Sequence, residues 1–252
     1  MASGCACLLH RSGFFRILMT EIERPRAVRR MVSFCEAVYE ARWTVEDVTA
    51  EKIDHVESAQ DLWEKRLIPV LVDPEASSRK VMKPDVLLDA VLAKRNLGTC
   101  IEDTPLVIAL GPGFCAGKDA HYVIETSRGH NLARLISQGS ASPNTGVPAE
   151  IGGHSVLRVL RSPADGVFQS DSLLGMQVTE GQVLGHVSGE PVRSGLKGVL
   201  RGLIRPGTPV TLNFKLGDID PRNAPAYCST ISERARAIGG SVLEAVLRTF
   251  NT

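Results

Sequence analysis

The sequence is poor in aromatic residues and has no excess of either charge. Only 5% of its 252 residues are aromatic, and 29 Lys and Arg are matched by 28 Asp and Glu. Proteins that bind nucleic acids usually combine a basic surface with aromatic side chains on which bases stack. The composition therefore argues against a nucleic-acid partner, and the charge balance gives no support for an electrostatic membrane-surface role.

Long apolar runs and a signal peptide are also missing. The longest apolar runs, 67–72 and 105–110, fall far short of the ~20 residues that span a bilayer. The N-terminus has no basic stretch followed by a long apolar core. We therefore expect no membrane partner and a cytoplasmic location.

Cysteines are few and scattered, and no CxxC pair occurs among them. Their spacing is wrong for a structural zinc site. Cys5 and Cys7 are separated by one residue, so on a helix their side chains would point about 200° apart and would ligate a shared ion poorly. We expect free thiols in a reducing compartment and no metal site.

Up to about residue 140, expected strands alternate with expected helices. Residues 68–72 and 106–110 are apolar on both faces, as in a parallel sheet that helices cover on both sides. The remaining patterns indicate strands at 14–22 and 85–93, and helices at 2–12, 24–30 and 59–66. We predict an α/β fold in which residues 1–140 form a Rossmann-like, mostly parallel sheet.

The second half of the chain has a different texture. Residues 141–154 are rich in Gly, Pro, Ser and Asn, which predicts a linker. Residues 155–220 hold short strand patterns and Gly turns that repeat weakly after roughly 30 residues. Two interlocking halves predict an appended β module like a barrel-sandwich hybrid, the fold of biotinyl and lipoyl domains. No lysine stands at the tip between the halves, so neither biotin nor lipoyl attachment is expected.

The C-terminal segment, residues 228–252, returns to helical patterning. It contains two capping boxes, TISE and SVLE, which are separated by Gly239 and Gly240. We predict two C-terminal helices whose apolar stripe packs on the body of the protein.

The glycine-rich segment 111–119 is the strongest local signal for a ligand. It directly follows the expected strand 106–110, and its glycines would let main-chain amides approach an anion closely. The segment is not a Walker A loop, because its glycine spacing differs and an acidic residue replaces the hydroxyl. A tight turn without a ligand is the alternative. The residues expected to contact the ligand are Gly111, Gly113, Gly117, Lys118 and Asp119.

A second polar cluster follows the apolar segment 85–93. Lys94, Arg95 and Asn96 would stand at the carboxyl end of a parallel strand, where α/β sheets bind ligands. The two cations could hold a phosphate or carboxylate group. A solvated loop is the alternative.

Three titratable side chains beyond the glycine-rich segment are candidates for proton transfer or polar contact. His121 and Glu125 would share one face of a strand, and His130 follows nearby. A satisfied polar pair at a sheet edge is the alternative reading.

An acidic residue and a basic run follow the first expected strand. Glu21 ends that strand, where dinucleotide folds use an acidic residue to bind a ribose, although no GxGxxG precedes it. The basic run would either bind phosphate or form a charged helix face, and consists of Arg24, Arg26, Arg29 and Arg30.

Seven segments, taken together, resemble one protein family. They are EIERPRAVRRMVSFCEAVYE (21–40), LVDPE (71–75), KPDVLLDAVLAKRNLGT (83–99), LVIALGPGFCAGKDAHYVIETSRGH (106–130), GSASPNTGVPAEIGG (139–153), RSPADGVF (161–168) and TISERARAIGGSVLEAVL (230–247). Their order along the chain is similar to that in the accessory proteins of selenium-dependent molybdenum hydroxylases, the YqeB type. The likeness extends distantly to XdhC-type molybdenum cofactor chaperones.

The resemblance implies a factor that matures molybdenum hydroxylases by binding an anionic cofactor, a nucleotide or a selenium intermediate. Its partners would be a client hydroxylase and a small anionic ligand, with a homo-oligomer left open. Two alternatives remain: a nucleotide-dependent transferase or oxidoreductase using the same crevice, and a non-enzymatic scaffold.

The N-terminus departs from the family pattern. Met1-Ala-Ser-Gly4 stands where relatives have Leu-Ala-Ser-Gly after a first strand and a glycine turn, both of which this sequence lacks. We expect that the native start lies upstream and that Gly4 belongs to the ligand-binding turn.

Overall fold

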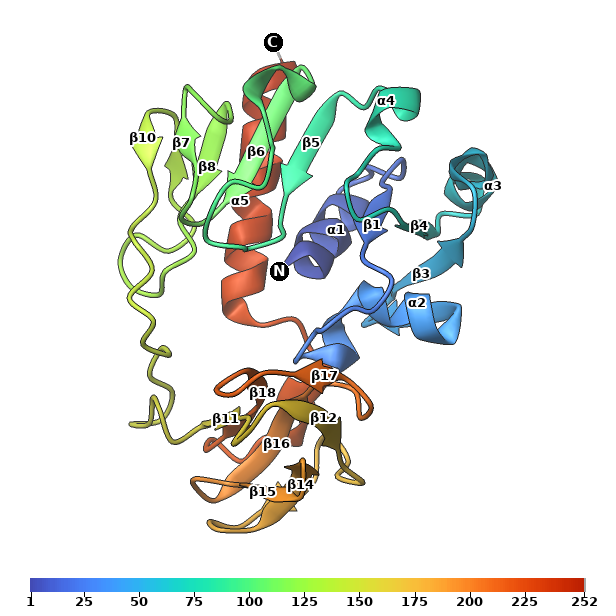
Figure 1. Cartoon of the computed structure of the whole chain (residues 1–252). Coiled ribbons are helices and arrows are strands. Elements are labelled where there is room, and N and C mark those ends of the chain that lie inside the picture. Colours follow the sequence, from blue (N-terminus) through green and yellow to red (C-terminus); the bar gives the residue numbers. More distant parts are fainter. Residues whose placement is uncertain (252) are drawn as a thin grey trace. The chain divides into compact units, whose positions relative to one another are not determined.

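The computed structural model of the chain describes residues 1–251 (Figure 1). Thr252, the last residue of the predicted C-terminal helical segment, lies outside the described residues. The architecture is α/β, as predicted, with parallel and antiparallel strand pairing. No helix within residues 1–251 is both long enough and apolar enough to cross a bilayer.

The chain divides into two compact units, and each is assembled from separate stretches of sequence. The first unit comprises Met1–Glu23, Asp47–Thr145 and the segment from Ile231 onward, and the second comprises Arg24–Glu46 and Gly146–Thr230. Sequence analysis expected residues 1–140 to form one region. The segment Arg24–Glu46 instead packs with the second unit, where Val28 joins the apolar core and accepts a bond from the Leu203 amide.

Two sheets form the centre of the first unit. In one, β4 (Ile68–Val72) pairs in parallel with both β1 (Met19–Glu21) and β3 (Val48–Ile53). In the other, β6 (Leu106–Leu110) pairs in parallel with β5 (Val86–Asp89) and β8 (Tyr122–Ile124), and β9 (Leu135–Ile136) adds an antiparallel edge. A further pair joins β7 (Cys115–Ala116) to β10 (Gly139–Ser140).

Every residue of β6 is buried, which explains its continuous apolar run. Leu106, Ile108 and Leu110 share a core with α5 (Glu233–Phe250), whereas Val107 and Ala109 face a second cluster on the opposite side. The carboxyl end of β5 points downward in Figure 1, and its parallel neighbours run the same way. These strand ends therefore define one edge of the sheet.

Short helices complete the first unit. Its remaining helical elements are α1 (Ala2–Arg11), η3 (Val56–Ser58), α3 (Ala59–Glu64), α4 (Arg79–Met82) and η4 (Ile101–Asp103). The helices predicted at 2–12 and 59–66 agree closely with α1 and α3. The strand predicted at 14–22 shrinks to β1, which is partly exposed.

The prediction of two C-terminal helices is wrong, because α5 runs unbroken through Gly239 and Gly240. Gly239 lies where α5 crosses α1, and a Cβ there would lie 3.3 Å from Leu8 Cβ and 3.4 Å from Cys5 Cα. The missing side chain lets two helices approach closely, so this glycine serves packing rather than helix termination.

The second unit begins with short elements instead of the helix predicted at 24–30. These are η1 (Arg30–Val32), η2 (Phe34–Glu36), α2 (Ala37–Glu40) and β2 (Arg42–Val45). Its last element is η5 (Pro225–Cys228).

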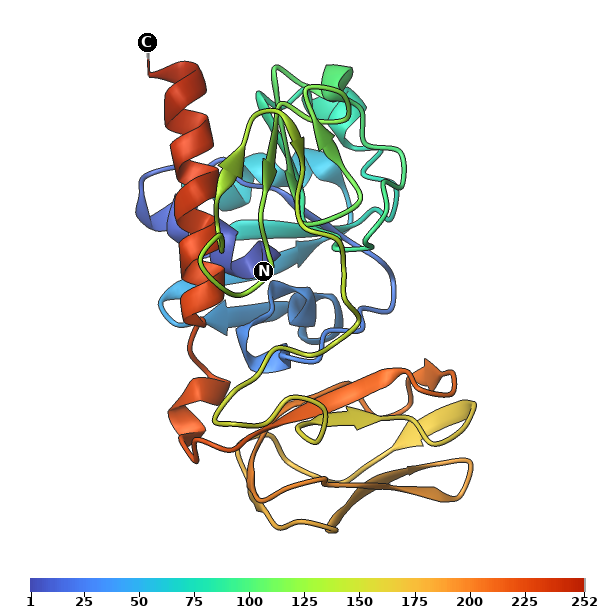
Figure 2. The same ribbon diagram turned by 90° about the vertical axis from the view of Figure 1, so that its left-hand side faces the viewer.

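The rest of the second unit is two four-stranded antiparallel sheets that share one apolar core (Figure 2). One sheet has the order β11-β18-β16-β13, with β11 (Val159–Arg161), β18 (Lys215–Asp220), β16 (Gly198–Leu203) and β13 (Gln177–Val178). The other has the order β15-β14-β12-β17, with β15 (Glu190–Arg193), β14 (Val183–Val187), β12 (Gly166–Gln169) and β17 (Pro209–Val210).

The repeated segments occupy equivalent places in the two sheets. β12 and β14 of the first half pair with each other, as β16 and β18 of the second half do. Each half also gives a short strand to the other half's sheet, because β13 pairs with β16 and β17 pairs with β12. The weak repeat in the sequence therefore corresponds to two strand-exchanged halves.

Candidate functional site at the carboxyl edge of a parallel sheet

The loops that follow β5 and β6 pack main chain against main chain. A Cβ on Gly113 would lie 2.5 Å from the Arg95 backbone nitrogen and 2.6 Å from its Cα, and Gly113 has φ +109°. Any other residue would clash there and would be strained in the left-handed region. The structure thus brings together the two segments that the sequence assigned to one ligand.

Positive charge and main-chain donors are both available where these loops meet. Lys94 and Arg95 are exposed. Within residues 1–251, the amides of Gly113 and Phe114 donate to no acceptor. Two neighbouring amides beside two cations suit a small anion.

The other amides of the glycine-rich segment are already used. Gly111 donates to the Ile124 carbonyl at 2.9 Å, Gly117 to Ala120 at 2.8 Å, and both Lys118 and Asp119 to Cys115. The Asp119 carboxylate accepts from the Cys115 amide at 2.7 Å. Gly111, Gly117 and Asp119 therefore shape the fold of the loop, and their amides are engaged within it.

Lys118 and His121 lie toward the opposite edge of the sheet. The His121 amide donates to the Val107 carbonyl at 2.9 Å, and its Nδ1 accepts from the Val107 amide at 3.0 Å. Val107 stands near the amino end of β6, and Lys118 belongs to the turn that leads into β8. Lys118 was predicted to bind the same ligand as Lys94 and Arg95. The strand direction instead places Lys118 toward the amino edge of the sheet and the other two cations at its carboxyl edge.

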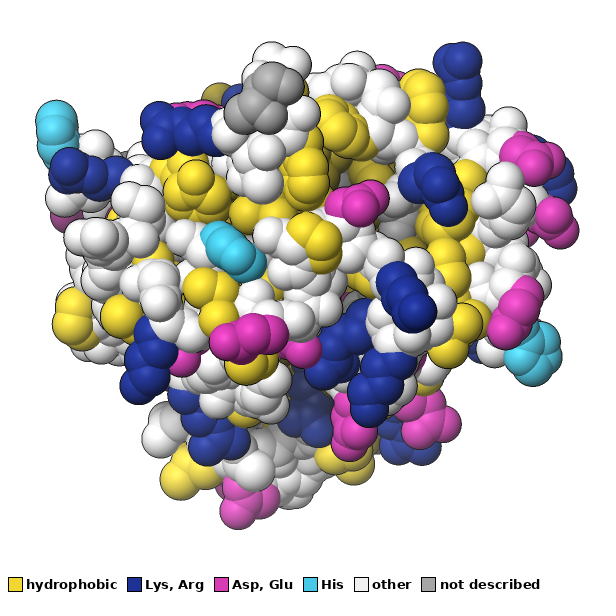
Figure 3. Space-filling view, turned by 90° about the horizontal axis from the view of Figure 1, so that it is seen from above, with side chains coloured by type: hydrophobic (Ala, Val, Ile, Leu, Met, Phe, Trp, Pro, Cys, Tyr) yellow, Lys and Arg dark blue, Asp and Glu magenta, His cyan; other side chains and the backbone are white. Residues whose placement is uncertain are grey.

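Figure 3, a view from above, shows cationic and anionic side chains interspersed with hydrophobic ones over the face that it presents.

Glu125 directly follows β8 and is 3% exposed, and it stands at the same carboxyl edge as Gly111 and Gly113. Its two oxygens accept from the Ser127 and Ser142 amides, each at 2.7 Å. Burial disfavours the charged form, yet these amide bonds outweigh it and lower the pKa of Glu125. A carboxylate held this way stays ionised and is a poor general base.

His121 and Glu125 therefore do not form a pair. They share the parity of one strand face, but they stand at its opposite ends, separated by about 13 Å of extended chain. His130 is exposed in the turn after β8. No group of three or more His, Cys, Asp or Glu residues within the described chain is arranged to hold a metal ion.

A pocket of about 430 Å³ opens beside Glu125. Its lining is mainly polar and consists of Glu125, Asn131, Arg134, Leu135, Ile136, Ser137, Gln138, Ser140 and Ser142. No residue of 94–96 or 111–119 lines it. Thr126 follows Glu125 in the chain and packs against Gly111 of the glycine-rich segment. A Cβ on Gly111 would lie 2.6 Å from Thr126 Oγ1.

Three further predicted site residues make contacts within the first unit. Asn96 accepts from the Gly98 and Thr99 amides and donates to the Thr99 carbonyl, each at 2.8 Å, so its side chain is committed to its own loop. Gly4 lies inside α1, where a Cβ would lie 2.9 Å from Ala235 Cβ. Glu21 ends β1 in the other sheet and accepts from the Ile22 amide at 2.8 Å.

Arg234, whose charge interacts with Glu125 and Arg128, could not be assigned to this region from the sequence. Arg234 is in the first turn of α5, its Nε is buried without an acceptor among the described residues, and burial followed by repulsion from Arg128 lowers its pKa. Arg128 forms an ion pair with Glu233. An arginine in the first turn of a helix is unfavourable, because it opposes the helix dipole. This unfavourable position is the feature of the sequence that could have pointed to Arg234.

Comparison with known proteins gives one extensive match. This chain resembles YqeB. It is 47% identical over 247 residues to YqeB of Escherichia coli (strain K12), an uncharacterized protein, and the match covers 98% of this chain and 46% of YqeB. The chain thus spans about half the length of that curated relative. No family model matches the chain.

Matches to solved structures are short. An aspartoacylase family protein of Mesorhizobium loti gives a TM-score of 0.24 at 18% identity, over 34% of this chain and 27% of that protein. The ectoine utilization protein EutE (DoeB) of Ruegeria pomeroyi gives 0.23 at 18% identity, over 34% and 28%. TM-scores this low do not indicate a common fold.

Proposed function

We propose that this chain is part of an accessory factor that matures selenium-dependent molybdenum hydroxylases. It would hold an anionic cofactor, a nucleotide or a selenium-bearing intermediate for a client hydroxylase. The ordered segments that resemble this family support the pathway, and the geometry at the carboxyl edge supports the handling of an anion. The chain would work in the cytoplasm with its client.

One observation is central to the binding role: the loop after β5 lies against the loop after β6, where neighbouring parallel strands end. α/β sheets bind ligands at such edges. Lys94 and Arg95 would neutralise the anionic part, and the amides of Gly113 and Phe114 would orient it. Residues of this type suit the phosphate of a molybdenum cofactor or of a nucleotide.

The same geometry favours binding over catalysis. Glu125 has both oxygens occupied by amides, and His121 stands at the other end of the strand. The polar pocket beside Glu125 would take the uncharged part of the ligand. A transferase or oxidoreductase using this crevice would need a proton-transfer group that these two residues do not supply.

We also propose finer fold assignments. The parallel β5-β6-β8 sheet would belong to a Rossmann-like region. The strand-exchanged halves of the second unit would be a barrel-sandwich hybrid without a carrier lysine. The exchange of β13 and β17 between the sheets supports this assignment.

Purification under reducing, anaerobic conditions, followed by elemental analysis for molybdenum and selenium, tests the pathway. Calorimetric titration with molybdate, phosphate and AMP tests the site. We expect Arg95→Ala to weaken binding about 10-fold or more, because it removes a charge-assisted contact.

Lys118→Ala is the matched control, since it removes an equally exposed cation from the opposite edge. Equal losses in both variants, or no binding of any probe and no co-purifying molybdenum or selenium, would contradict the proposal.

A further inference from the structure

The two halves of the second unit repeat each other closely. The Ser162 amide donates to the Phe214 carbonyl at 2.9 Å, and the Ser194 amide donates to the Gln182 carbonyl at 2.9 Å. Each serine hydroxyl also donates to the carbonyl two residues further along the chain, at 2.6 Å. Positions of the second half therefore have counterparts about 32 residues earlier, in the first half. The surroundings of the two halves can thus be compared position by position.

The end of β16, in the second half, is covered by the segment Arg24–Glu46 of the same unit. The Leu203 amide donates to the Val28 carbonyl at 2.9 Å, and the Leu203 carbonyl accepts from Arg30 Nε at 2.8 Å. A Cβ on Gly202 would lie 2.7 Å from Val28 Cγ1, so the segment lies directly against the strand. The main-chain amide and carbonyl of Leu203 are therefore both bonded to the covering segment.

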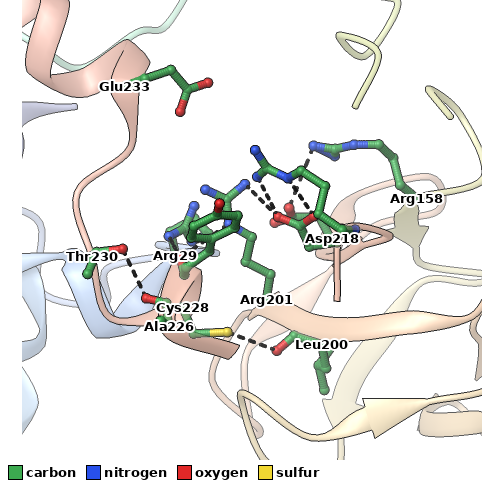
Figure 4. Close-up of polar contacts among 12 residues, drawn as sticks. Arg29, Arg158, Leu200, Arg201, Asp218, Ala226, Cys228, Thr230 and Glu233 are labelled. Atoms are coloured by element: carbon green, nitrogen blue, oxygen red, sulfur yellow. Dashed lines mark hydrogen bonds and ion pairs between the residues drawn. The ribbon is translucent and has the colours of Figure 1, made fainter. Parts of the chain in front are cut away.

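Side chains around the same strand end also hold the segment. Arg205 Nη2 donates to Glu36 Oε2 at 2.7 Å, and its guanidinium carbon lies 4.2 Å from the centre of the Tyr39 ring. Figure 4 shows Arg29 of the segment next to Arg201 of β16, and both donate to one main-chain carbonyl. The segment is therefore bound by main-chain hydrogen bonds and by charged side chains together.

The corresponding end of β12, in the first half, is open. A pocket of about 630 Å³ lies there. Its lining includes the counterparts of the β16 positions that meet the segment. The counterparts of Arg201, Gly202, Leu203 and Arg205 are, in this order, Gln169, Ser170, Asp171 and Leu173. The pocket therefore occupies the place that is filled by a peptide segment in the second half.

Groups that have partners at the end of β16 lack them at the end of β12. Within residues 1–251, neither the amide nor the carbonyl of Asp171 makes a hydrogen bond. Leu173 is 74% exposed, and Met176 and Val183 extend the apolar wall of the pocket. The pocket therefore offers an extended peptide a main-chain donor, a main-chain acceptor and an apolar surface.

We infer that this pocket binds an extended segment of a partner protein, much as Arg24–Glu46 is bound at the end of β16. The partner segment would carry a large apolar side chain, because Ser170 replaces Gly202 and its Cβ keeps the partner's main chain farther from the strand. The lining contains Asp171 but no lysine or arginine, so charge complementarity favours a lysine or arginine beside that apolar residue.

Nuclear magnetic resonance of the full, isotope-labelled chain tests the inference. The probe is the synthetic peptide RPRALRR, which copies residues 24–30 with the single change Val28→Leu. We expect saturable shifts of the Asp171 and Leu173 amides, with a dissociation constant below about 1 mM. A second peptide with serine in place of that leucine should bind about 10-fold more weakly, because it lacks the apolar side chain that the pocket buries.

Two exposed leucines of the second unit supply matched variants. Leu173→Ser should weaken binding of the leucine peptide about 5-fold or more, since Leu173 lines the pocket. Leu212→Ser should change it by less than about 2-fold, because Leu212 is 56% exposed and does not line the pocket. Asp171→Lys should also weaken binding, most strongly at low salt, because it places a cation against a basic peptide. Circular dichroism and the thermal midpoint check that each variant folds.

Three results would overturn the inference: no shifts at millimolar peptide, shifts confined to other parts of the chain, or equal losses in Leu173→Ser and Leu212→Ser. A dimer in sedimentation that Leu173→Ser dissociates would do the same, because a second copy of the chain would then be the occupant. Arg95→Ala should bind the peptide as tightly as its parent, so the outcome is independent of the carboxyl-edge site.

Discussion

At the scale of single residues, charge compensation decides what each titratable group does. Glu125 illustrates this. The Ser127 and Ser142 amides hold its pKa below the unfolded value of about 4.3, in spite of burial. The bonds therefore contribute to the free energy of unfolding above that pH, and the contribution is lost as the pH falls through the native pKa.

Glu125→Gln should lower the free energy of unfolding by about 1–3 kcal/mol near neutral pH. Because protonation removes the same advantage from the wild-type carboxylate, the difference should shrink below about pH 4. Urea unfolding at several pH values measures this. The exposed Glu57→Gln serves as a control. A difference that stays constant down to acid pH would show that the amide bonds do not depend on the charge.

The second residue-scale prediction concerns Asp220. Asp220→Asn should cost about 3 kcal/mol or more of stability, because Arg201, which is only 5% exposed, would lose its carboxylate partner. The surface variant Glu244→Gln breaks an ion pair with Arg248 and should cost less than about 0.5 kcal/mol. Thermal unfolding compares the two, and equal effects would mean that Asp220 is not a partner of buried charge.

The residue scale is also where the sequence was least informative. Lys94, Arg95 and Gly113 could be predicted to meet, because each follows an apolar strand and parallel strands end at one edge. For Asn96 and Gly4, the sequence could not distinguish a ligand contact from a packing role. Asn96 bonds the main chain of its own loop, and Gly4 lies at the crossing of α1 and α5, and no local sequence pattern shows either contact. The ion pairs of Arg158 with Asp218 and of Arg201 with Asp220 join distant positions, which only the folded second unit brings together.

At the scale of elements, the crossing of α1 and α5 is set by small residues. A Cβ on Gly4 would lie 2.9 Å from Ala235 Cβ and 3.3 Å from Ile231 Cγ2. Gly4→Val should therefore lower the free energy of unfolding by about 1–3 kcal/mol through overpacking. Gly240→Ala, at a position with nothing within 4 Å, should be neutral or stabilising by up to about 1 kcal/mol.

Chemical denaturation monitored by circular dichroism measures both variants. If Gly4→Val were as stable as the parent, the close helix crossing would not exist in solution, and Gly4 would regain its place as a candidate ligand-binding residue.

Element predictions succeeded where burial imposes a pattern on both faces of a strand. The expected strands at 68–72 and 106–110 coincide with β4 and β6. They failed where glycines were taken as breaks, because Gly239 is present for packing against α1. They also failed at 24–30, where the expected helix is instead an irregular segment that leads into η1, and Arg29 and Arg30 bond main-chain carbonyls of the second unit.

At the scale of the whole molecule, the chain assembles two units from interleaved stretches, and the exposed cations Lys94 and Arg95 stand together at one sheet edge of the first unit. The composition, with nearly equal totals of each charge, does not reveal this. Lys94 and Arg95 are neighbours in the sequence, and folding places them at the carboxyl edge of the β5-β6-β8 sheet. Function is therefore expected to depend on an anionic ligand at that edge.

The most direct measurement of the central claim is a crystal structure of the chain soaked with tungstate, a heavy oxyanion that anomalous scattering locates without ambiguity. The account predicts a peak within hydrogen-bond distance of the Gly113 and Phe114 amides, beside Arg95, that disappears in Arg95→Ala. Peaks confined to the Lys118 turn, or no peak at the ends of β5 and β6, would contradict the proposed site.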